Sequence, residues 1–167
     1  MALSYRVRDA RQPRQPFLDE AGIAQGANVL DFGCGPGSYT VPAARMVGQS
    51  GNVFALDVHP EALRITSERA SKAGLSNVHI IRSDCGTALP DGSVDVALLY
   101  DVYHDLEDPG AVLAELHRVL KPAGILSSHD HHLKTERLRE AIESSGLFRV
   151  THQGTLTITC APERKTS

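Results

Sequence analysis

The sequence predicts an α/β fold: a doubly wound, Rossmann-like, mostly parallel sheet that ends in a C-terminal antiparallel hairpin. Apolar runs typical of buried strands alternate with helical segments along almost the whole chain, which predicts a parallel sheet with helices on both faces. Residues 29–40, VLDFGCGPGSYT, join a buried strand to a helix through alternate glycines. Residues 148–162 alternate in polarity around Gly154, and this pattern predicts the closing hairpin.

The individual elements follow from apolar periodicity and from the glycines and prolines between them. A short helix at residues 16–24 precedes the glycine loop. Strands are expected at residues 29–32, 52–58, 77–82, 94–100 and 125–129. Longer helices are expected at residues 38–47, 60–74, 108–120 and 135–146.

The boundaries of the helices carry their own signals. Pro60 and Pro109 fall where a helix tolerates proline, in its first turn. Residues 121–124 are expected to form a turn before the fifth strand. Side chains that can cap a helix N-terminus precede or begin three of the helices: Ser38, Asp108 and Thr135.

We divide the 167 residues into an N-terminal lid or helix segment, residues 1–28, and a single ligand-binding domain, residues 29–167. The formal net charge of −3 gives no general attraction to nucleic acid. No apolar run is long enough to span a bilayer. Three cysteines without CxxC spacing indicate a reducing compartment. We therefore expect a cytoplasmic protein that binds neither nucleic acid nor membranes.

The glycine loop predicts a ligand site. Gly33, Gly35 and Gly37 have no Cβ atoms, so they can take positive φ and let a ligand approach the backbone. The helix that follows favours anionic groups at its N-terminus. Asp31, two residues before the first glycine, suits a ligand with an ammonium group, bound directly or through water.

Polar residues also follow the next three strands, and ligands of such sheets bind outside the carboxyl ends of the strands. Asp57 is placed to accept hydrogen bonds from a ribose diol. Asp84 is placed to accept from an adenine amino group, with the Cys85 N–H directed at a ring nitrogen. Tyr100 and Asp101 come last, beside the reacting end of the ligand. Together with the glycine loop, these positions indicate a nucleoside site.

These segments resemble class I S-adenosylmethionine-dependent methyltransferases, in particular the small-molecule group that includes the quinone-biosynthesis enzymes. The matching stretches are VLDFGCGPGSYT, FALDVHPEAL, SDCGTALPDGSVDVALLYDVYHDLEDP and ELHRVLKPAGIL, within residues 29–126. The resemblance implies a seven-stranded sheet, S-adenosylmethionine as cofactor, S-adenosylhomocysteine as product, and a small-molecule acceptor. The residues expected at the cofactor are Asp31, Gly33, Cys34, Gly35, Gly37, Thr40, Asp57, Val58, Asp84, Cys85 and Tyr100.

Two other functions remain open from the sequence. An NAD-binding Rossmann protein would also use Gly33, Gly35 and Asp57, but Asp31 and Asp84 have no task in a dinucleotide site. A non-catalytic protein that binds the nucleoside cofactor and regulates a partner would keep the whole cofactor site.

The acceptor side is expected beyond the fourth and fifth strands. His104 is a candidate general base, and Asp101, His129 and His131 are further catalytic candidates. We expect Tyr100 and these four residues to line one polar pocket. His129 and His131 would share a side of the chain, with His104 or Asp101 as a third metal ligand, but a polar pocket wall is preferred to a metal site.

No insertion covers this pocket. Either the N-terminal segment or a second subunit, in a homodimer, is expected to close it. The N-terminal arginines form either a lid for an acidic group or a solvated arm, and the arm is preferred; these arginines are Arg6, Arg8, Arg11 and Arg14.

Overall fold

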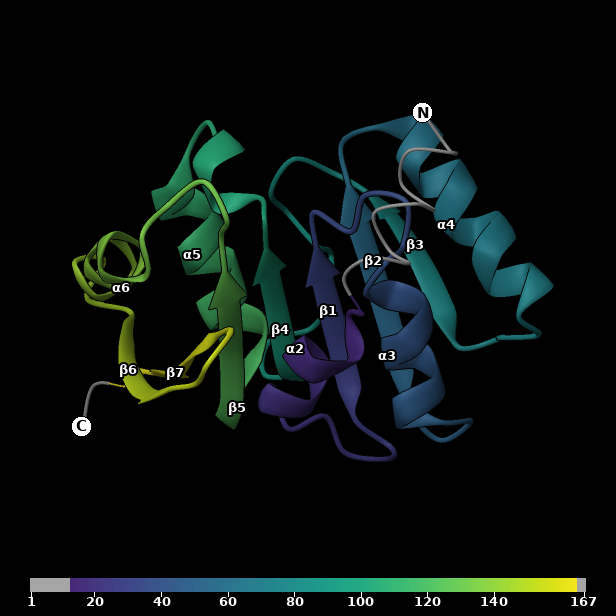
Figure 1. The fold of residues 1–167 in the computed structure, drawn as a ribbon, viewed down its shortest axis with the longest axis horizontal. Helices are drawn as coiled ribbons and strands as arrows, with labels where there is room; N and C mark the ends of the chain where they lie inside the picture. The colour runs from purple at the N-terminus through teal and green to yellow at the C-terminus, as the bar shows by residue number, and fades with distance from the viewer. Residues whose placement is uncertain (1–12, 165–167) are drawn as a thin grey trace.

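A mixed seven-stranded sheet forms the centre of the computed structural model, which describes residues 13–164 (Figure 1). The strands are β1 (Asn28–Phe32), β2 (Asn52–Asp57), β3 (Val78–Arg82), β4 (Val94–Tyr100), β5 (Leu120–His129), β6 (Phe148–Gln153) and β7 (Ile158–Pro162). Their order is β3-β2-β1-β4-β5-β7-β6, and all neighbours pair in parallel except β7, which is antiparallel to β5 and β6. The expected fold class and closing hairpin are confirmed.

Helices cover both faces of the sheet. They are α2 (Gln15–Glu20), α3 (Thr40–Val47), α4 (Pro60–Lys72), α5 (Pro109–Val119) and α6 (Thr135–Glu143), with a 3-10 turn η1 (Tyr103–Asp105). Apolar side chains of α2 and α3 pack with Val29, Val53 and Leu98 on one face. Those of α5 and α6 pack with Leu30 and Phe32 on the other face. Because successive strand residues point to opposite faces, one strand supplies both cores.

Several element boundaries differ from the prediction. Helix α3 begins at Thr40, with Tyr39 at its N-cap and no side-chain capping bond, so the expected cap by Ser38 is wrong. Thr135 lies inside α6, and its N-cap Lys134 makes no side-chain capping bond either. The cap by Asp108 is confirmed, because its Oδ1 accepts the Ala111 N–H at 2.9 Å.

The turn expected at residues 121–124 is part of β5. Leu120 already pairs with Val94, and the register shifts before Ile125 pairs with Val96. Lys121 Nζ lies 2.7 Å from Asp95 Oδ1 across this irregularity. Proline and glycine in the segment predict a turn, yet the neighbouring strand retains it as a bulge.

Helix α2 is tied to the hairpin at the far end of the chain. The Glu20 carboxylate accepts the main-chain N–H groups of residues 155–157 at 2.8–3.1 Å, and also the Thr157 hydroxyl at 2.9 Å. Burial opposes ionisation, but these hydrogen bonds lower the pKa of Glu20 overall. The bond set holds the loop between β6 and β7 against α2.

Two expectations extend beyond the described residues: the arm of N-terminal arginines and the lack of a membrane-spanning segment. Arg6, Arg8 and Arg11 precede residue 13, so the arm they were expected to form is not described. Arg14 is described and only 7% exposed, with Nη1 donating to the Tyr39 hydroxyl at 3.0 Å, so it does not belong to a solvated arm. Among residues 13–164, no helix combines the length and apolarity needed to cross a membrane.

Candidate active site

The order of the strands reverses between β1 and β4, and this places a ligand crevice at their carboxyl ends. The glycine loop leaves β1 at this point. Gly33, Gly35 and Gly37 all have positive φ, at 75°, 52° and 79°. The N–H groups of Gly33 and Cys34 donate to the Leu56 carbonyl of β2 at 2.8 and 2.9 Å. The loop is thus fixed by its own main chain against the neighbouring strand.

The three glycines serve different purposes. A Cβ on Gly33 would lie 2.5 Å from Val102 Cγ2, and one on Gly37 would lie 2.9 Å from Thr66 Oγ1. These two glycines are required by packing. A Cβ on Gly35 would have no atom within 4 Å. Gly35 is therefore the open position of the loop, where a ligand can approach the backbone.

Asp57 at the end of β2 holds this open position. Its Oδ2 accepts the Gly35 N–H at 2.9 Å, and its Oδ1 accepts the His59 N–H at 2.9 Å. The residue is only 8% exposed. A carboxylate has about four lone-pair sites, so two bonds leave capacity for two further donors. This matches the two hydroxyls of a ribose.

Helix α4 supports the loop from the other side. Thr66 Oγ1 donates to the Gly35 carbonyl at 2.8 Å, and Arg69 Nη1 donates to the Pro36 carbonyl at 2.9 Å. Neither support was predicted from the sequence. Their distance of more than 30 residues from the loop leaves no local signal.

Asp31 lies beneath the loop, on the face of β1 that α3 covers. Its Oδ2 accepts the Thr40 hydroxyl at 2.6 Å, and it is 2% exposed. Burial raises the pKa of Asp31 to about 6; the Thr40 bond opposes this rise and the charge of Asp57 adds to it. Burial also raises the pKa of the neighbouring Cys34 thiol. A cationic ligand group would stabilise the ionised form of Asp31.

The next expected cofactor residues surround the crevice beyond β2 and β3. Val58 is 44% exposed, which is unusual for a large apolar side chain in this structure. Asp84 is exposed, and Cys85 is half-buried. The Cys85 N–H donates to the Ser83 hydroxyl at 3.2 Å, so a ligand atom would replace or share that bond. An exposed valine beside Asp57 offers an apolar surface to a nucleobase.

Tyr100 lies below the site rather than on its surface. Its hydroxyl is 2.6 Å from Ser127 Oγ, and its ring centroid is 4.8 Å from that of Tyr39. Burial raises its pKa. Phe17 of α2 contacts this ring, with centroids 6.0 Å apart, and lies 5.1 Å from the imidazole of His129. The aromatic rings form a packed floor under the carboxyl ends of β4 and β5.

Asp101 connects the ends of β4 and β5. Its backbone is left-handed, with φ at 54°, a conformation that non-glycine residues rarely adopt. Its N–H donates to the His129 carbonyl at 2.8 Å. Asp101 Oδ1 lies 2.7 Å from His131 Nδ1 and 3.6 Å from His129 Nε2. Three of the residues expected in one polar pocket thus lie together.

Asp130 holds His104, the fourth residue expected in this pocket, beside the ends of β4 and β5. Its Oδ2 is 2.8 Å from His104 Nδ1, and its carboxylate also accepts the main-chain N–H groups of His104 and His132 at 3.1 and 2.9 Å. Burial alone would raise the pKa of Asp130, but these bonds lower it overall. When the ring donates Nδ1–H to Asp130, Nε2 is the nitrogen left to accept a proton, and it lies 3.3 Å from Asp105 Oδ2.

Asp130 was not among the predicted site residues. The signal was present in the run His129–His132, where Asp130 is the one carboxylate. Its partner lies 26 residues earlier, and only the pairing of β4 with β5 brings the two together.

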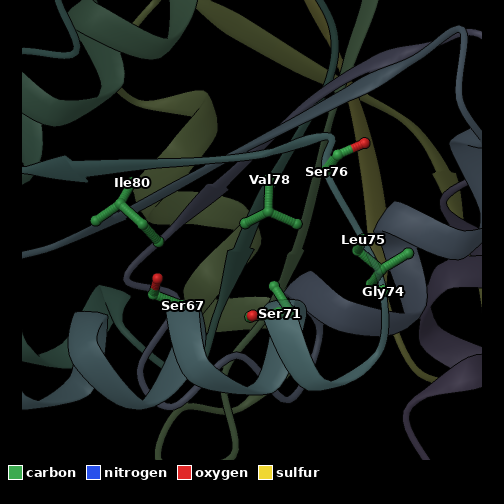
Figure 2. A pocket seen from close by; sticks show the side chains of 8 residues that line it. Ser67, Ser71, Gly74, Leu75, Ser76, Val78 and Ile80 are labelled. Atoms are coloured by element: carbon green, nitrogen blue, oxygen red, sulfur yellow. The ribbon is translucent and has the colours of Figure 1, made fainter.

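Two hollows can be compared with this site. An open hollow of about 260 Å³ lies between α4 and β3. Figure 2 shows the side chains that line it, which include serines and Leu75, Val78 and Ile80. None of the residues that line it in the described part of the chain has a titratable side chain. A smaller cavity of about 60 Å³ lies between β5, α6 and the loop from β6 to β7, and His129 and Asp130 contribute to its wall. The groups with acid–base chemistry lie at the strand ends.

This chain is similar to known proteins over most of its length. A methyltransferase domain family matches residues 23–157. A demethylmenaquinone methyltransferase from Geobacillus stearothermophilus is 31% identical over 113 residues, which are 67% of this chain and 48% of that protein. One from Listeria monocytogenes serotype 4a is 33% identical over 109 residues, 65% of this chain and 46% of that protein. The chain spans about half the length of these curated relatives.

Solved structures extend the likeness over almost the whole chain. A SAM-dependent methyltransferase from Aquifex aeolicus has a TM-score of 0.80 at 27% identity, covering 95% of this chain and 96% of that one. The [4+2]-cyclase SpnF has a TM-score of 0.71 at 21% identity, covering 83% and 57%. The second shows only a shared fold, and it illustrates that a fold does not specify a reaction.

Proposed function

Because this chain belongs to the methyltransferase domain family, we propose that it transfers the methyl group of S-adenosylmethionine to a small-molecule acceptor. The observation that carries the proposal is the glycine loop with its one open position, Gly35, bonded to the Asp57 carboxylate at 2.9 Å. This arrangement fits a ribose, whose hydroxyls would use the remaining lone pairs of Asp57. S-adenosylmethionine, when bound, supplies an electrophilic methyl group on a sulfonium and leaves as S-adenosylhomocysteine.

The remaining cofactor contacts follow from the same geometry. Asp31, buried beneath the loop, would pair with the ammonium of the methionine part, directly or through the Thr40 hydroxyl or a water. Val58 would pack against the adenine, and Asp84 and Cys85 would accept and donate at its edge. Main-chain groups of the glycine loop would line the rest of the site. Tyr100 would support the site from below, through its contact with Tyr39.

The acceptor would lie against the cluster at the ends of β4 and β5. Positioning supplies most of the catalysis, since the methyl group is already activated. For a hydroxyl or amine acceptor, its lone pair forms the new bond to carbon while the carbon–sulfur bond breaks toward sulfur. We assign the acceptor proton to Nε2 of His104, because Asp130 engages the other ring nitrogen. Asp101, His129 and His131 would orient the acceptor by hydrogen bonds.

The polar lining limits the class of acceptor. The curated relatives are named for activity on demethylmenaquinone. Here carboxylates and imidazoles surround the acceptor side, and such groups favour a small molecule rich in oxygen or nitrogen. We therefore propose a polar acceptor for this chain.

Calorimetry tests the cofactor assignment. S-adenosylmethionine and S-adenosylhomocysteine should each bind with a dissociation constant of about 1–100 μM, with NAD as the comparison ligand. Tight binding of NAD with no heat from either adenosyl ligand would contradict the proposal. Mass spectrometry of a panel of small acceptors then separates an enzyme from a non-catalytic binder: an enzyme adds 14 Da, one CH2 group, to an acceptor. A binder forms no such product from any of them.

A further inference from the structure

Three potential metal ligands meet at the carboxyl ends of β4 and β5. One ligand atom each from Asp101, Asp130 and His131 lies within 4.8 Å of the other two. We propose that these three residues bind one divalent first-row transition-metal ion. From its sequence, this region was expected to be a polar wall rather than a metal site of His129, His131 and either His104 or Asp101; the geometry keeps Asp101 and His131 and adds Asp130.

The spacing suits a common ion. Metal–ligand bonds of about 2.0–2.2 Å place ligands of one ion about 3–4.4 Å apart, so a small inward movement completes the site. The main chain already fixes two of the three ligands. The Asp101 N–H is bonded to the His129 carbonyl at 2.8 Å, and the His131 N–H to Asp101 Oδ1 at 3.0 Å. Such second contacts orient metal ligands in proteins.

Asp130 retains capacity for a metal. It accepts three donors: Nδ1–H and N–H of His104, and N–H of His132. His104 Nδ1 lies 2.8 Å from Oδ2 and 3.0 Å from Oδ1, so one N–H spans both oxygens, and an ion would take over one of these two contacts. The Asp130 side chain is fully buried, at 0% exposure, so its direction is fixed. His104 would be the residue that holds this ligand in place.

The charge of the cluster also calls for a cation. Within residues 13–164, the ion-pair partners of Asp101 and Asp130 are imidazoles only: His129, His131 and His104. No lysine or arginine of the described residues forms an ion pair with either carboxylate. A divalent ion supplies the matching charge.

The donor set selects among ions. Carboxylates alone suit Mg2+ or Ca2+, whereas an added imidazole favours Mn2+, Fe2+, Co2+ or Zn2+. His131 now lies 2.7 Å from Asp101 through Nδ1. To bind an ion there it would carry its proton on Nε2, as the other neutral tautomer. Its side chain is 51% exposed, which leaves open coordination positions for water or an acceptor oxygen. That last step rests on the proposed function; the ion site does not.

Binding of Co2+ alone to the purified full chain tests the site. Visible absorption and calorimetry should report one Co2+ per chain, with a dissociation constant below about 100 μM. The variants Asp101→Asn and His131→Gln should each weaken binding by at least about tenfold. The matched controls are Asp19→Asn and His152→Gln, which alter exposed residues outside the cluster and should bind Co2+ as the original chain does.

Binding by the unaltered protein can be located without any variant. Mn2+ should broaden the amide signals of residues 101 and 130–132 selectively, by paramagnetic relaxation. No saturable binding, broadening centred elsewhere, or equal binding by both ligand variants would overturn the proposal. Because neither assay contains S-adenosylmethionine or an acceptor, failure of the ion site is distinct from failure of methyl transfer, which the calorimetry with adenosyl ligands reports.

Discussion

The two halves of the crevice are built in different ways. Beside β1 and β2, the main chain makes the site: positive φ at three glycines, N–H groups bonded to Leu56, and one carboxylate, Asp57, on the Gly35 N–H. Beside β4 and β5, side chains make it, through the pairs Asp101–His131 and Asp130–His104. The first half has a fixed main-chain shape, and it is the half to which we assign the cofactor. The second half presents titratable side chains, and it is the half to which we assign the acceptor.

This difference separates binding from chemistry. Changes near the glycine loop should alter cofactor affinity, and changes in the cluster should alter turnover. Crossed effects would show that the two halves are coupled, with Asp101 as the connecting residue, since its charge also raises the pKa of Tyr39 beside the loop, although burial is the larger cause.

The largest effect is expected from His104→Asn. Asparagine keeps a donor for Asp130 but removes the basic Nε2, so kcat for a hydroxyl or amine acceptor should fall by about 100-fold or more. The affinity for S-adenosylmethionine should not change. His79→Asn is the control, because His79 is an exposed imidazole on β3 that contacts Asn52. Steady-state kinetics and calorimetry make the comparison. An unchanged kcat in a folded His104→Asn protein would exclude the base role.

Asp57→Ala should affect the other half. It removes the acceptor of the Gly35 N–H and the charge facing the ribose, so cofactor binding should weaken by about 2–3 kcal/mol, roughly 30- to 150-fold. Asp95→Ala is the matched control. Asp95 also accepts a main-chain N–H, from Asn28 at 2.9 Å, but at the opposite ends of the strands. If both variants bind the cofactor equally, Asp57 has only a structural role.

The sequence predicted the main-chain half better than the side-chain half. Glycine spacing and the acid after the second strand are local signals, and the structure brings Gly35 and Asp57 together. The supports Thr66 and Arg69 depend on how α4 packs on the loop, which no local pattern records. The turn predicted at residues 121–124 was wrong for a related reason. Pairing of this segment with β4 overrode its local preference for a turn.

The acceptor side shows the same limit. Histidines and acids after the fourth and fifth strands could be named from the sequence because parallel strands end at one edge. The hydrogen-bond partners of these side chains could not be predicted from the sequence. Asp130, rather than a predicted residue, holds His104, and Tyr100 turns its hydroxyl to Ser127. These choices depend on side-chain directions that follow only from the assembled sheet.

Asp31→Asn is expected to increase the stability of the fold and to weaken the binding of S-adenosylmethionine. Because burial raises the pKa of Asp31 to about 6, the folded protein holds this proton more tightly than the unfolded chain. The resulting stability is complete below about pH 4 and is lost as the pH rises through about 6. Asparagine avoids that loss, so the free energy of unfolding should increase by up to about 3 kcal/mol at pH 8 and remain unchanged near pH 4.

Urea unfolding at the two pH values checks this expectation, with the exposed Asp19→Asn as control. Affinity for S-adenosylmethionine should fall in the variant, whereas methylthioadenosine, which lacks the ammonium, should bind as before. Equal gains at both pH values would mean that titration of Asp31 is not the cause.

The smallest change in stability is expected from alanine substitutions at two glycines, Gly35 in the loop and Gly74 outside the crevice. Gly35 and Gly74 both have positive φ, at 52° and 68°, and a Cβ on either would meet no atom within 4 Å. Alanine at either position should therefore reduce the free energy of unfolding by a similar amount, about 1 kcal/mol. Gly74 lies at the end of α4, away from the crevice, so Gly74→Ala should bind the cofactor normally. Only Gly35→Ala should lose affinity in calorimetry, because its methyl group occupies the space where the cofactor meets the backbone. Equal affinities for the two variants would show that the open space beside Gly35 is not the cofactor site.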